Sequence, residues 1–197
     1  MSKRSISDVD LGGMRGRTAV VRADLNVPLD DGFITDDQRI RASLPTLRRL
    51  TGAGARVVLL SHLGRPEGRV DSAFSLAPVA SRLSELIDSR VHFIAHTNGD
   101  FADSELAILG AGEIALLENT RFEAGEVIND PALAESWAAL ADLYVNDAFG
   151  TAHRAHASTA GLATAIRAKG GDAVAGLLME KELAFLAEAL HMPEEPF

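Results

Sequence analysis

Short runs of apolar residues recur along the chain, and polar, glycine or proline residues bound each run. The run Val57–Leu60 is the clearest, because it is continuous and begins with β-branched residues. Continuous apolar runs of this length are typical of strands that are buried on both faces, as in a parallel sheet. On this pattern we predict these strands: Thr18–Arg22, Arg56–Leu60, Val91–Ala95, Ile114–Leu117 and Leu143–Val145.

The segments between these runs show the three- and four-residue apolar spacing of amphipathic helices. The first helix is predicted to begin at Thr35, which suits an N-cap and has Gln38 at the capping-box position. Pro45 lies inside this helix and predicts a kink or a break. Further helices are predicted after Ser75, near Phe101–Leu109, from Pro131, and over Gly176–Leu190.

Strands that alternate with helices indicate βαβ units with right-handed crossovers. We therefore predict an α/β fold with three layers, αβα, in which a mainly parallel, Rossmann-like sheet carries helices on both faces. Two segments between the elements are expected to be irregular, Asp30–Thr35 as a surface excursion and Ala168–Asp172 as a flexible loop.

The composition narrows the class of partner. With 197 residues the chain can bury one sizeable core. Its net charge of −9 argues against nucleic acid or an anionic membrane as the main partner. It has no cysteine, which excludes disulfides and thiolate metal sites, and no apolar stretch that suits a secretion leader or a membrane span. These features predict a cytoplasmic protein.

Polar and cationic residues follow most of the predicted strands. They are Asp24, Asn26, Arg39 and Arg41 after the first strand, His62 and Arg65 after the second, Glu118, Asn119 and Arg121 after the fourth, and Asn146, Asp147, His153, Arg154 and His156 after the fifth. The carboxyl ends of parallel strands share one rim of the sheet, where ligands bind. Cations gathered there in an acidic protein predict a site for a small, multiply charged anion, held by bidentate arginine contacts.

Simpler interpretations of some of these residues stay open. Arg39 lies in or next to the first turn of a helix, where a cation opposes the macrodipole. Such departures are tolerated at functional sites, but Arg39 can equally pair with Asp36 or Asp37 on a solvated face. Asp24 and Asn26 are also common turn residues.

Other kinds of site are not indicated. His153 and His156 lie three residues apart, but neither a Cys nor a carboxylate stands at ligand spacing, so we predict no metal site. The sequence has no P-loop and no G-x-S-x-G elbow, and its glycines do not complete G-x-G-x-x-G.

A family resemblance covers nearly the whole chain, from about Val20 to Leu183. The segments that carry it are VRADLNVPL, ITDDQRIRASLPTL, VVLLSHLGRP, SLAPVASRLSELI, LLENTRF, YVNDAFGTAHRAHAST and GLLMEKEL. In these segments, and in their order, the chain resembles phosphoglycerate kinase. No single motif would suffice, but seven in sequence make the resemblance specific.

The resemblance implies two α/β domains that face a cleft and are joined by a helix. This chain is similar to the 3-phosphoglycerate-binding half only. The implied division is residues 1–175 as the substrate-binding domain, 176–190 as the interdomain helix, and 191–197 as the start of a linker. The second domain, which in this family binds Mg-ATP, is absent, so we expect a truncated chain or a separated domain.

The resemblance also implies a site and a reaction. The implied substrate-binding residues are Asp24, Asn26, Arg39, His62, Leu63, Gly64, Arg65, Arg121 and Arg154. Arg39 is implied to be catalytic, as the residue nearest the transferred phosphoryl group. The reaction is reversible phosphoryl transfer between ATP and 3-phosphoglycerate, in a family that is monomeric. This chain alone is expected to bind the substrate without turning it over.

Two other functions are compatible with the residues alone. A stand-alone α/β domain can use such a rim to bind phosphate or another anion, or to dock a partner. A nucleotide-binding protein with an atypical site is a third, weaker interpretation.

Overall fold

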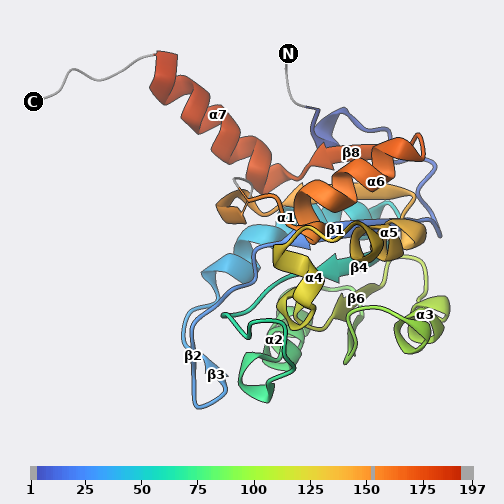
Figure 1. The fold of residues 1–197 in the computed structure, drawn as a ribbon. Coiled ribbons are helices and arrows are strands. Elements are labelled where there is room, and N and C mark those ends of the chain that lie inside the picture. The colour runs from blue at the N-terminus through green and yellow to red at the C-terminus, as the bar shows by residue number, and fades with distance from the viewer. Residues whose placement is uncertain (1–3, 152–153, 192–197) are drawn as a thin grey trace, which may run out of the picture.

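The computed structural model describes residues 4–151 and 154–191, with side chains to residue 187. A parallel six-stranded sheet forms its centre, and helices cover both faces of the sheet (Figure 1). The spatial order of the strands is β5-β6-β4-β1-β7-β8. Their bounds are β1 Thr18–Ala23, β4 Arg56–Leu60, β5 Val91–Ile94, β6 Ile114–Leu117, β7 Leu143–Asp147 and β8 Asp172–Ala175. The predicted α/β class is confirmed.

The helices divide between the two faces of the sheet. Their bounds are α1 Gln38–Gly52, α2 Ala77–Leu86, α3 Asp100–Ala107, α4 Ala124–Val127, α5 Pro131–Leu140, α6 Leu162–Ala168 and α7 Leu177–His191. The apolar residues of α1 and α2 pack in one core with Val57 and Leu59 of β4. Those of α3, α5 and α6 pack in a second core with Val58 and Leu60. This alternation follows from the two-residue period of side chains along a strand.

Two segments predicted to be irregular contain strands. Residues 30–35 hold most of an antiparallel hairpin of β2 (Leu29–Asp30) and β3 (Phe33–Ile34). Asp31 and Gly32 turn it with φ angles of 47° and 80°, the left-handed pair that a tight hairpin favours. The predicted loop at 168–172 is wrong at its end, because β8 begins at Asp172 and pairs with β7. All three strands are short, so apolar periodicity gave no signal for them.

The first helix also differs from its prediction. It begins at Gln38, and Thr35 is not its N-cap, because the Thr35 hydroxyl donates to the Pro28 carbonyl at 3.4 Å. The carboxylate of Asp36 accepts the Gln38 N–H at 2.8 Å instead. The break considered at Pro45 does not occur. Pro45 is exposed, and the buried Leu44 and Leu47 beside it pack α1 on the core and keep the helix continuous.

No helix in the described part of the chain has both the length and the apolar character needed to cross a bilayer.

Candidate functional site

The loops that follow β1, β4, β6 and β7 lie side by side, because these strands are neighbours in one parallel sheet. The chain leaves β1 in the middle of the sheet, adds β4, β5 and β6 on one side, and then adds β7 and β8 on the other. The reversal between β1 and β7 is a topological switch point, where ligands bind in open α/β sheets.

The loop after β4 is held in place by its neighbours on both sides. The Gly64 N–H donates to the Asn26 side-chain oxygen at 2.8 Å, and the Gly64 carbonyl accepts from Arg121 at 2.6 Å. The Leu63 carbonyl accepts from the Asn119 amide at 2.7 Å. Gly64 has a φ of 59°, and a Cβ there would lie 2.3 Å from the Phe74 ring. Leu63 and Gly64 therefore join the neighbouring loops through their backbone groups. Their implied contact with a substrate stays a prediction.

His62, at the start of this loop, is buried against a cation. Its Nδ1 lies 2.9 Å from Nη2 of Arg22, at the end of β1. Burial, with the charges of Arg22, Arg121, His156 and Arg154, lowers the pKa of His62 to about 2. His62 is therefore neutral at physiological pH.

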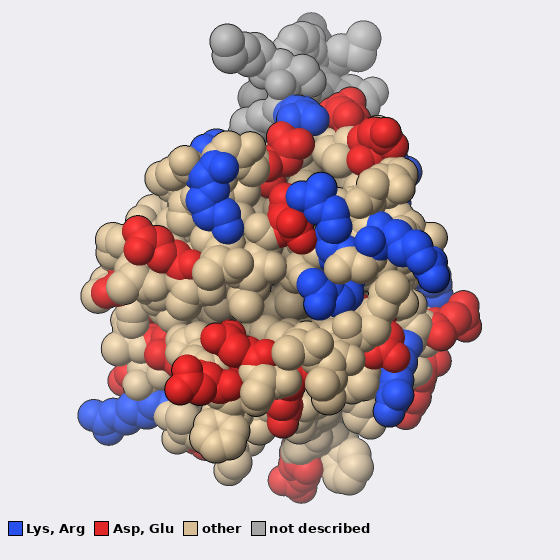
Figure 2. Space-filling view, turned by 90° about the vertical axis from the view of Figure 1, so that its right-hand side faces the viewer, with Lys and Arg blue, Asp and Glu red and all other residues tan. Residues whose placement is uncertain are grey.

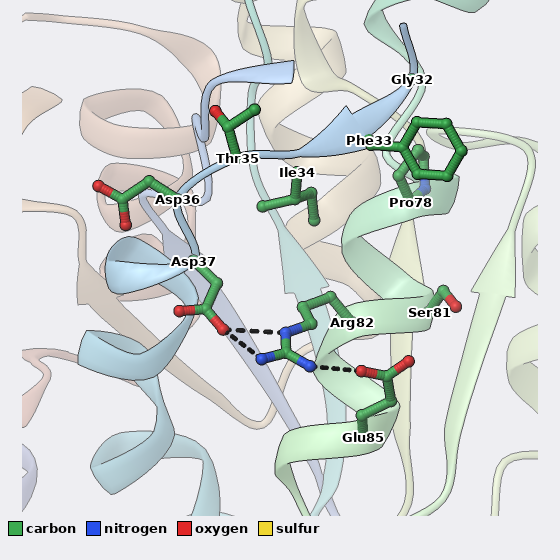
Figure 3. Close-up of a pocket in the computed structure, with 10 residues that line it drawn as sticks. All are labelled: Gly32, Phe33, Ile34, Thr35, Asp36, Asp37, Pro78, Ser81, Arg82 and Glu85. Atoms are coloured by element: carbon green, nitrogen blue, oxygen red, sulfur yellow. Dashed lines mark hydrogen bonds and ion pairs between the residues drawn. The ribbon is translucent and has the colours of Figure 1, made fainter. Parts of the chain in front are cut away.

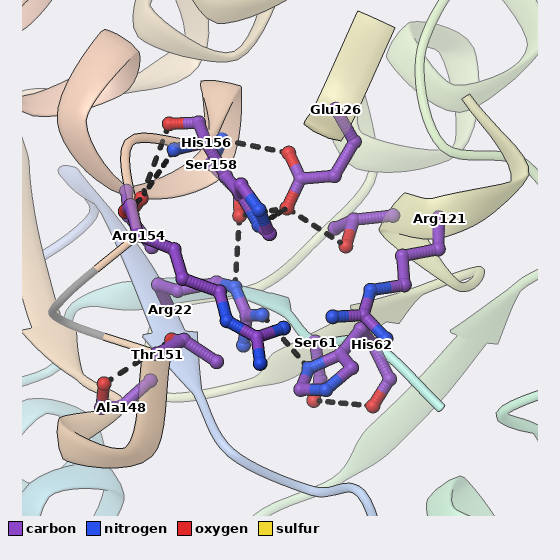
Figure 4. A network of polar contacts seen from close by, with 12 residues as sticks. Arg22, Ser61, His62, Arg121, Glu126, Ala148, Thr151, Arg154, His156 and Ser158 are labelled. Atoms are coloured by element: carbon purple, nitrogen blue, oxygen red, sulfur yellow. Dashed lines mark hydrogen bonds and ion pairs between the residues drawn. The ribbon is translucent and has the colours of Figure 1, made fainter. Parts of the chain in front are cut away.

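Three arginines from three loops line one cavity of about 400 Å³. Its lining residues are Arg65, Glu67, Gly68, Arg121, Glu123, Ala124, Val127, Arg154 and His156. Figure 4 shows Arg121 and Arg154 extending toward His62 from opposite sides. Burial lowers the pKa of Arg121, and the charge of Arg154 lowers it further. The three arginines outnumber the two carboxylates of the lining, Glu67 and Glu123, and an anion bound there would stabilise the charged form of Arg121.

The charge pattern differs on the side of the molecule away from α7. There, Lys and Arg side chains are interspersed with Asp and Glu (Figure 2). An ion pair outside the arginine cavity is that of Arg17 with Asp142 at 3.0 Å.

Arg39 lies near the start of α1 and forms an ion pair with Asp24, which follows β1. The alternative pairing of Arg39 with Asp36 or Asp37 is wrong. Asp37 instead accepts from Arg41 at 2.8 Å and from Arg82 at 2.7 Å. Arg39 does not line the arginine cavity among the described residues, and its side chain is 52% exposed against 11% for Asp24. It can leave Asp24 without disturbing the core.

The predicted site residues thus form two groups. Arg65, Arg121 and Arg154 line the cavity, and the buried His62 lies within the electrostatic influence of Arg121 and Arg154. Asn26, Leu63 and Gly64 hold the loop after β4 in place. Asp24 and Arg39 form an adjacent pair, linked to the loop because Asp24 accepts the Asn26 N–H at 3.4 Å.

Sequence reasoning missed the buried polar residues beneath the cavity. These are Arg22, Glu126 and Ser158. Arg22 offered a signal, since a charged residue at the end of an apolar strand is rarely buried without a partner. Glu126 and Ser158 offered none, because their contacts join segments 32 residues apart in the chain.

A larger cavity of about 660 Å³ lies between the β2–β3 hairpin and α2 (Figure 3). Its lining residues are Gly32, Phe33, Ile34, Thr35, Asp36, Asp37, Pro78, Ser81, Arg82 and Glu85. Asp37 and Glu85 both pair with Arg82. Acidic side chains therefore outnumber the one cation, which makes this cavity unsuited to an anion.

Within residues 4–151 and 154–191, no three His, Cys, Asp or Glu side chains gather as metal ligands would. The predicted relation of His153 to His156 lies outside the described residues. His156 itself has its Nδ1 at 3.9 Å from a Glu126 carboxylate oxygen.

Comparison with known proteins gives a consistent result at the levels of family, sequence and fold. The family profile described as phosphoglycerate kinase matches residues 6–197. The chain is 51% identical over 197 residues to the phosphoglycerate kinase of Thermosipho africanus, and it covers 47% of that protein. It is 53% identical over 198 residues to that of Herpetosiphon aurantiacus, covering 48%.

Solved structures share the fold. The phosphoglycerate kinase of Coxiella burnetii superposes with a TM-score of 0.83 at 39% identity, over 99% of this chain and 47% of that one. The enzyme of Pyrococcus horikoshii gives a TM-score of 0.84 at 35% identity, over 98% and 47%. The chain spans about half the length of the curated relatives it matches. With a family match that extends over nearly all of its length, this chain belongs to the phosphoglycerate kinase family.

Proposed function

We propose that this chain is the 3-phosphoglycerate-binding half of a phosphoglycerate kinase. The observation that carries the proposal is the convergence of Arg65, Arg121 and Arg154 on one cavity, beside a neutral His62. In this assignment residues 1–175 form the substrate-binding domain, 176–190 form a helix that leads toward a nucleotide-binding domain, and 191–197 begin the linker to it.

The chemistry of the cavity fits a phosphorylated three-carbon acid. Arginine forks match phosphate and carboxylate oxygens bidentately. A cavity of about 400 Å³ is at the small end of ligand pockets. Binding an anion stabilises the charged form of Arg121, whose pKa is otherwise lowered. An uncharged ligand would leave that unfavourable charge in place.

The adjacent pair of Asp24 and Arg39 supplies a second function. We assign Asp24 and Asn26 to the hydroxyl and carboxylate end of the substrate. Arg39 then turns from Asp24 to the equatorial oxygens of the transferred phosphoryl group, a movement that its exposure permits. Its guanidinium stabilises the charge that develops there, as an arginine finger does.

The reaction assigned to the whole enzyme is reversible phosphoryl transfer between ATP and the carboxylate of 3-phosphoglycerate. The attacking carboxylate is already an anion at neutral pH, so no general base is needed. The residues of this chain act by positioning and by neutralising charge. Mg-ATP binds to the other domain, and the two domains close to exclude water. We assign this activity to a cytoplasmic, monomeric enzyme.

Calorimetry with 3-phosphoglycerate tests the proposal. We expect binding by this chain and a loss of affinity of about tenfold in Arg65→Gln, because one charged hydrogen-bonding group is removed. Arg69→Gln is the matched control, since Arg69 is exposed on the same loop but does not line the cavity. Absence of binding at millimolar concentration would contradict the proposal. Equal affinity for inorganic phosphate would favour the stand-alone anion-binding module instead.

A further inference from the structure

Arg22 is a buried arginine whose contacts lead to the candidate site. Its side chain belongs to β1, and the residue is 1% exposed. Three of its nitrogens have different partners: Nε donates to the Ser158 hydroxyl at 2.8 Å, Nη1 to the Ala23 carbonyl, and Nη2 contacts Nδ1 of His62 at 2.9 Å. Figure 4 shows this guanidinium between Ser158 and His62.

The hydrogen bonds among Arg22, Ser158 and Glu126 form a chain in which Arg22 donates to Ser158 and Ser158 donates to Glu126. The Ser158 hydroxyl has one proton, and it accepts from Arg22 while lying 2.5 Å from the Glu126 carboxylate. It therefore donates to Glu126, which also accepts the Ser158 N–H at 2.8 Å. The fully buried carboxylate of Glu126 thus balances the buried charge of Arg22 through one hydroxyl. Two buried opposite charges that are linked in this way are tolerated only where their hydrogen bonds are satisfied.

The direction of the contact between Arg22 Nη2 and His62 Nδ1 determines which ring nitrogen of His62 carries the proton. A guanidinium can only donate, so Nδ1 of His62 must accept. The remaining ring proton is therefore on Nε2, and this N–H is the donor that the ring can offer to a ligand. The ring nitrogen that carries the proton is set by the hydrogen bond at the other nitrogen, as in metal-binding histidines.

We propose that Arg22 is a positioning residue that fixes His62 as the neutral Nε2–H tautomer, so that the ring donates a hydrogen bond to the anion bound in the arginine cavity. This inference rests on the proposed function for the identity of the anion. The groups that face His62 here are Arg22, Arg121, Arg154 and His156. In their company a second ring proton is unfavourable, which is consistent with the lowered pKa of His62.

The fork of an arginine is needed for this arrangement. One guanidinium reaches the Ser158 hydroxyl, the Ala23 carbonyl and His62 Nδ1 together because its donors diverge in one plane. A lysine at this position keeps the charge, but all of its N–H donors are on one nitrogen and cannot reach three separated acceptors. Arg22→Lys is therefore a conservative variant, and we expect that it does not fix the tautomer of His62.

The first test uses the unmodified chain and nitrogen-15 NMR of its histidines from pH 5 to pH 8. We expect the His62 signals to show an unprotonated Nδ1 and a protonated Nε2 throughout this range. Titration of His62 near pH 6.5, or a proton on Nδ1, would overturn the proposal. This test needs no substitution at a buried residue and no ligand.

The second test is a double-mutant cycle with 3-phosphoglycerate affinity as the readout. We expect Arg22→Lys and His62→Gln each to weaken binding about tenfold, by loss of one hydrogen bond to a charged group. The double variant should bind like His62→Gln alone, because Arg22 acts through His62. Additive losses would overturn the proposal.

Arg17→Lys is the control for the second test, since Arg17 precedes β1 at its other end and pairs with Asp142 on the surface. Its affinity and its His62 spectrum should match those of the unmodified chain. The tautomer is read without ligand, so a chain that binds no 3-phosphoglycerate contradicts the proposed function and leaves the NMR test of the His62 tautomer intact.

Discussion

Gly64 occupies a backbone conformation and a space that a larger residue cannot share. Its φ of 59° is strained for other residues, and the Phe74 ring fills the position of a Cβ. Both backbone groups of Gly64 are bonded to predicted site residues, Asn26 and Arg121. One glycine therefore connects three of the loops that form the rim.

Gly64→Ala is expected to lower the free energy of unfolding by about 2 kcal/mol or more, from left-handed strain and steric overlap together. Gly170→Ala is the matched control, since Gly170 has a φ of 76° and nothing within 4 Å of a Cβ. It should lose only the strain, about 1 kcal/mol. Urea denaturation measures both, and equal losses would show that the Phe74 contact has no effect.

The buried His62 makes stability depend on pH. Its pKa is about 2 in the folded chain, whereas an exposed histidine has a pKa near 6.5. Below pH 6.5 the unfolded chain takes up a proton that the folded chain refuses, so stability is lost as pH falls toward 2. From pH 7 to pH 5.5 we expect this residue to lower the unfolding free energy by about 1 kcal/mol.

Denaturation of the unmodified chain and of His62→Gln at both pH values checks this expectation. The variant should lose less stability than the unmodified chain over the same interval. An identical pH dependence in the two proteins would mean that His62 is already charged or accessible in the folded state.

At the scale of elements, α7 is joined to the sheet by a side chain from β7. Figure 1 shows α7 projecting from the body of the fold. The carboxylate of Asp147 accepts the backbone N–H groups of Leu178 and Met179 at 2.9 and 3.2 Å. The Leu177 N–H donates to the Thr46 hydroxyl of α1 at 2.9 Å. Burial raises the pKa of the Asp147 carboxyl.

Asp147→Ala is expected to destabilise the chain by about 1 to 2 kcal/mol, because the first turn of α7 loses its acceptor. Asp147→Asn keeps an oxygen acceptor and should lose less. Hydrogen exchange of the Leu178 and Met179 amides measures the effect at the helix itself. Equally slow exchange in both variants would mean that Asp147 does not anchor α7.

The elements also show what sequence reasoning could and could not provide. The rim could be predicted, because parallel strands place Asn26, His62 and Arg121 at one edge of the sheet whatever their side-chain contacts. Short strands such as β8 could not, because their pairing depends on neighbours rather than on a periodic pattern. The hydrogen bond from Arg22 to Ser158 could not be predicted either, because it depends on the packing of two segments that are distant in the sequence.

At the scale of the whole molecule, an acidic chain carries a cavity that is lined by three arginines. The net charge of −9 repels a small anion at long range, while the arginines of the cavity attract it at short range. The attraction is partly screened by salt because the cavity opens to solvent.

Raising sodium chloride from about 50 to about 500 mM is expected to weaken 3-phosphoglycerate binding several-fold, since the Debye length falls below the size of the cavity. Calorimetry at several salt concentrations measures the slope. Arg154→Gln should reduce the slope, because one charge is removed from the cavity. A slope of zero in the unmodified chain would mean that binding depends on uncharged contacts alone.

The residues before β1 contact two elements that come late in the sequence, β8 and α7. Ser5 forms a bridge with Ala175 at the end of β8, and the Ser7 hydroxyl donates to Glu180 of α7 at 2.8 Å. A ribosome makes the chain in one direction, so this opening segment emerges first and finds its partner last. Until residue 175 has left the exit tunnel, the edge of β8 does not exist for it to join. The contacts of Ser5 with Ala175 and of Ser7 with Glu180 therefore form only after β8 and the start of α7 have been synthesised.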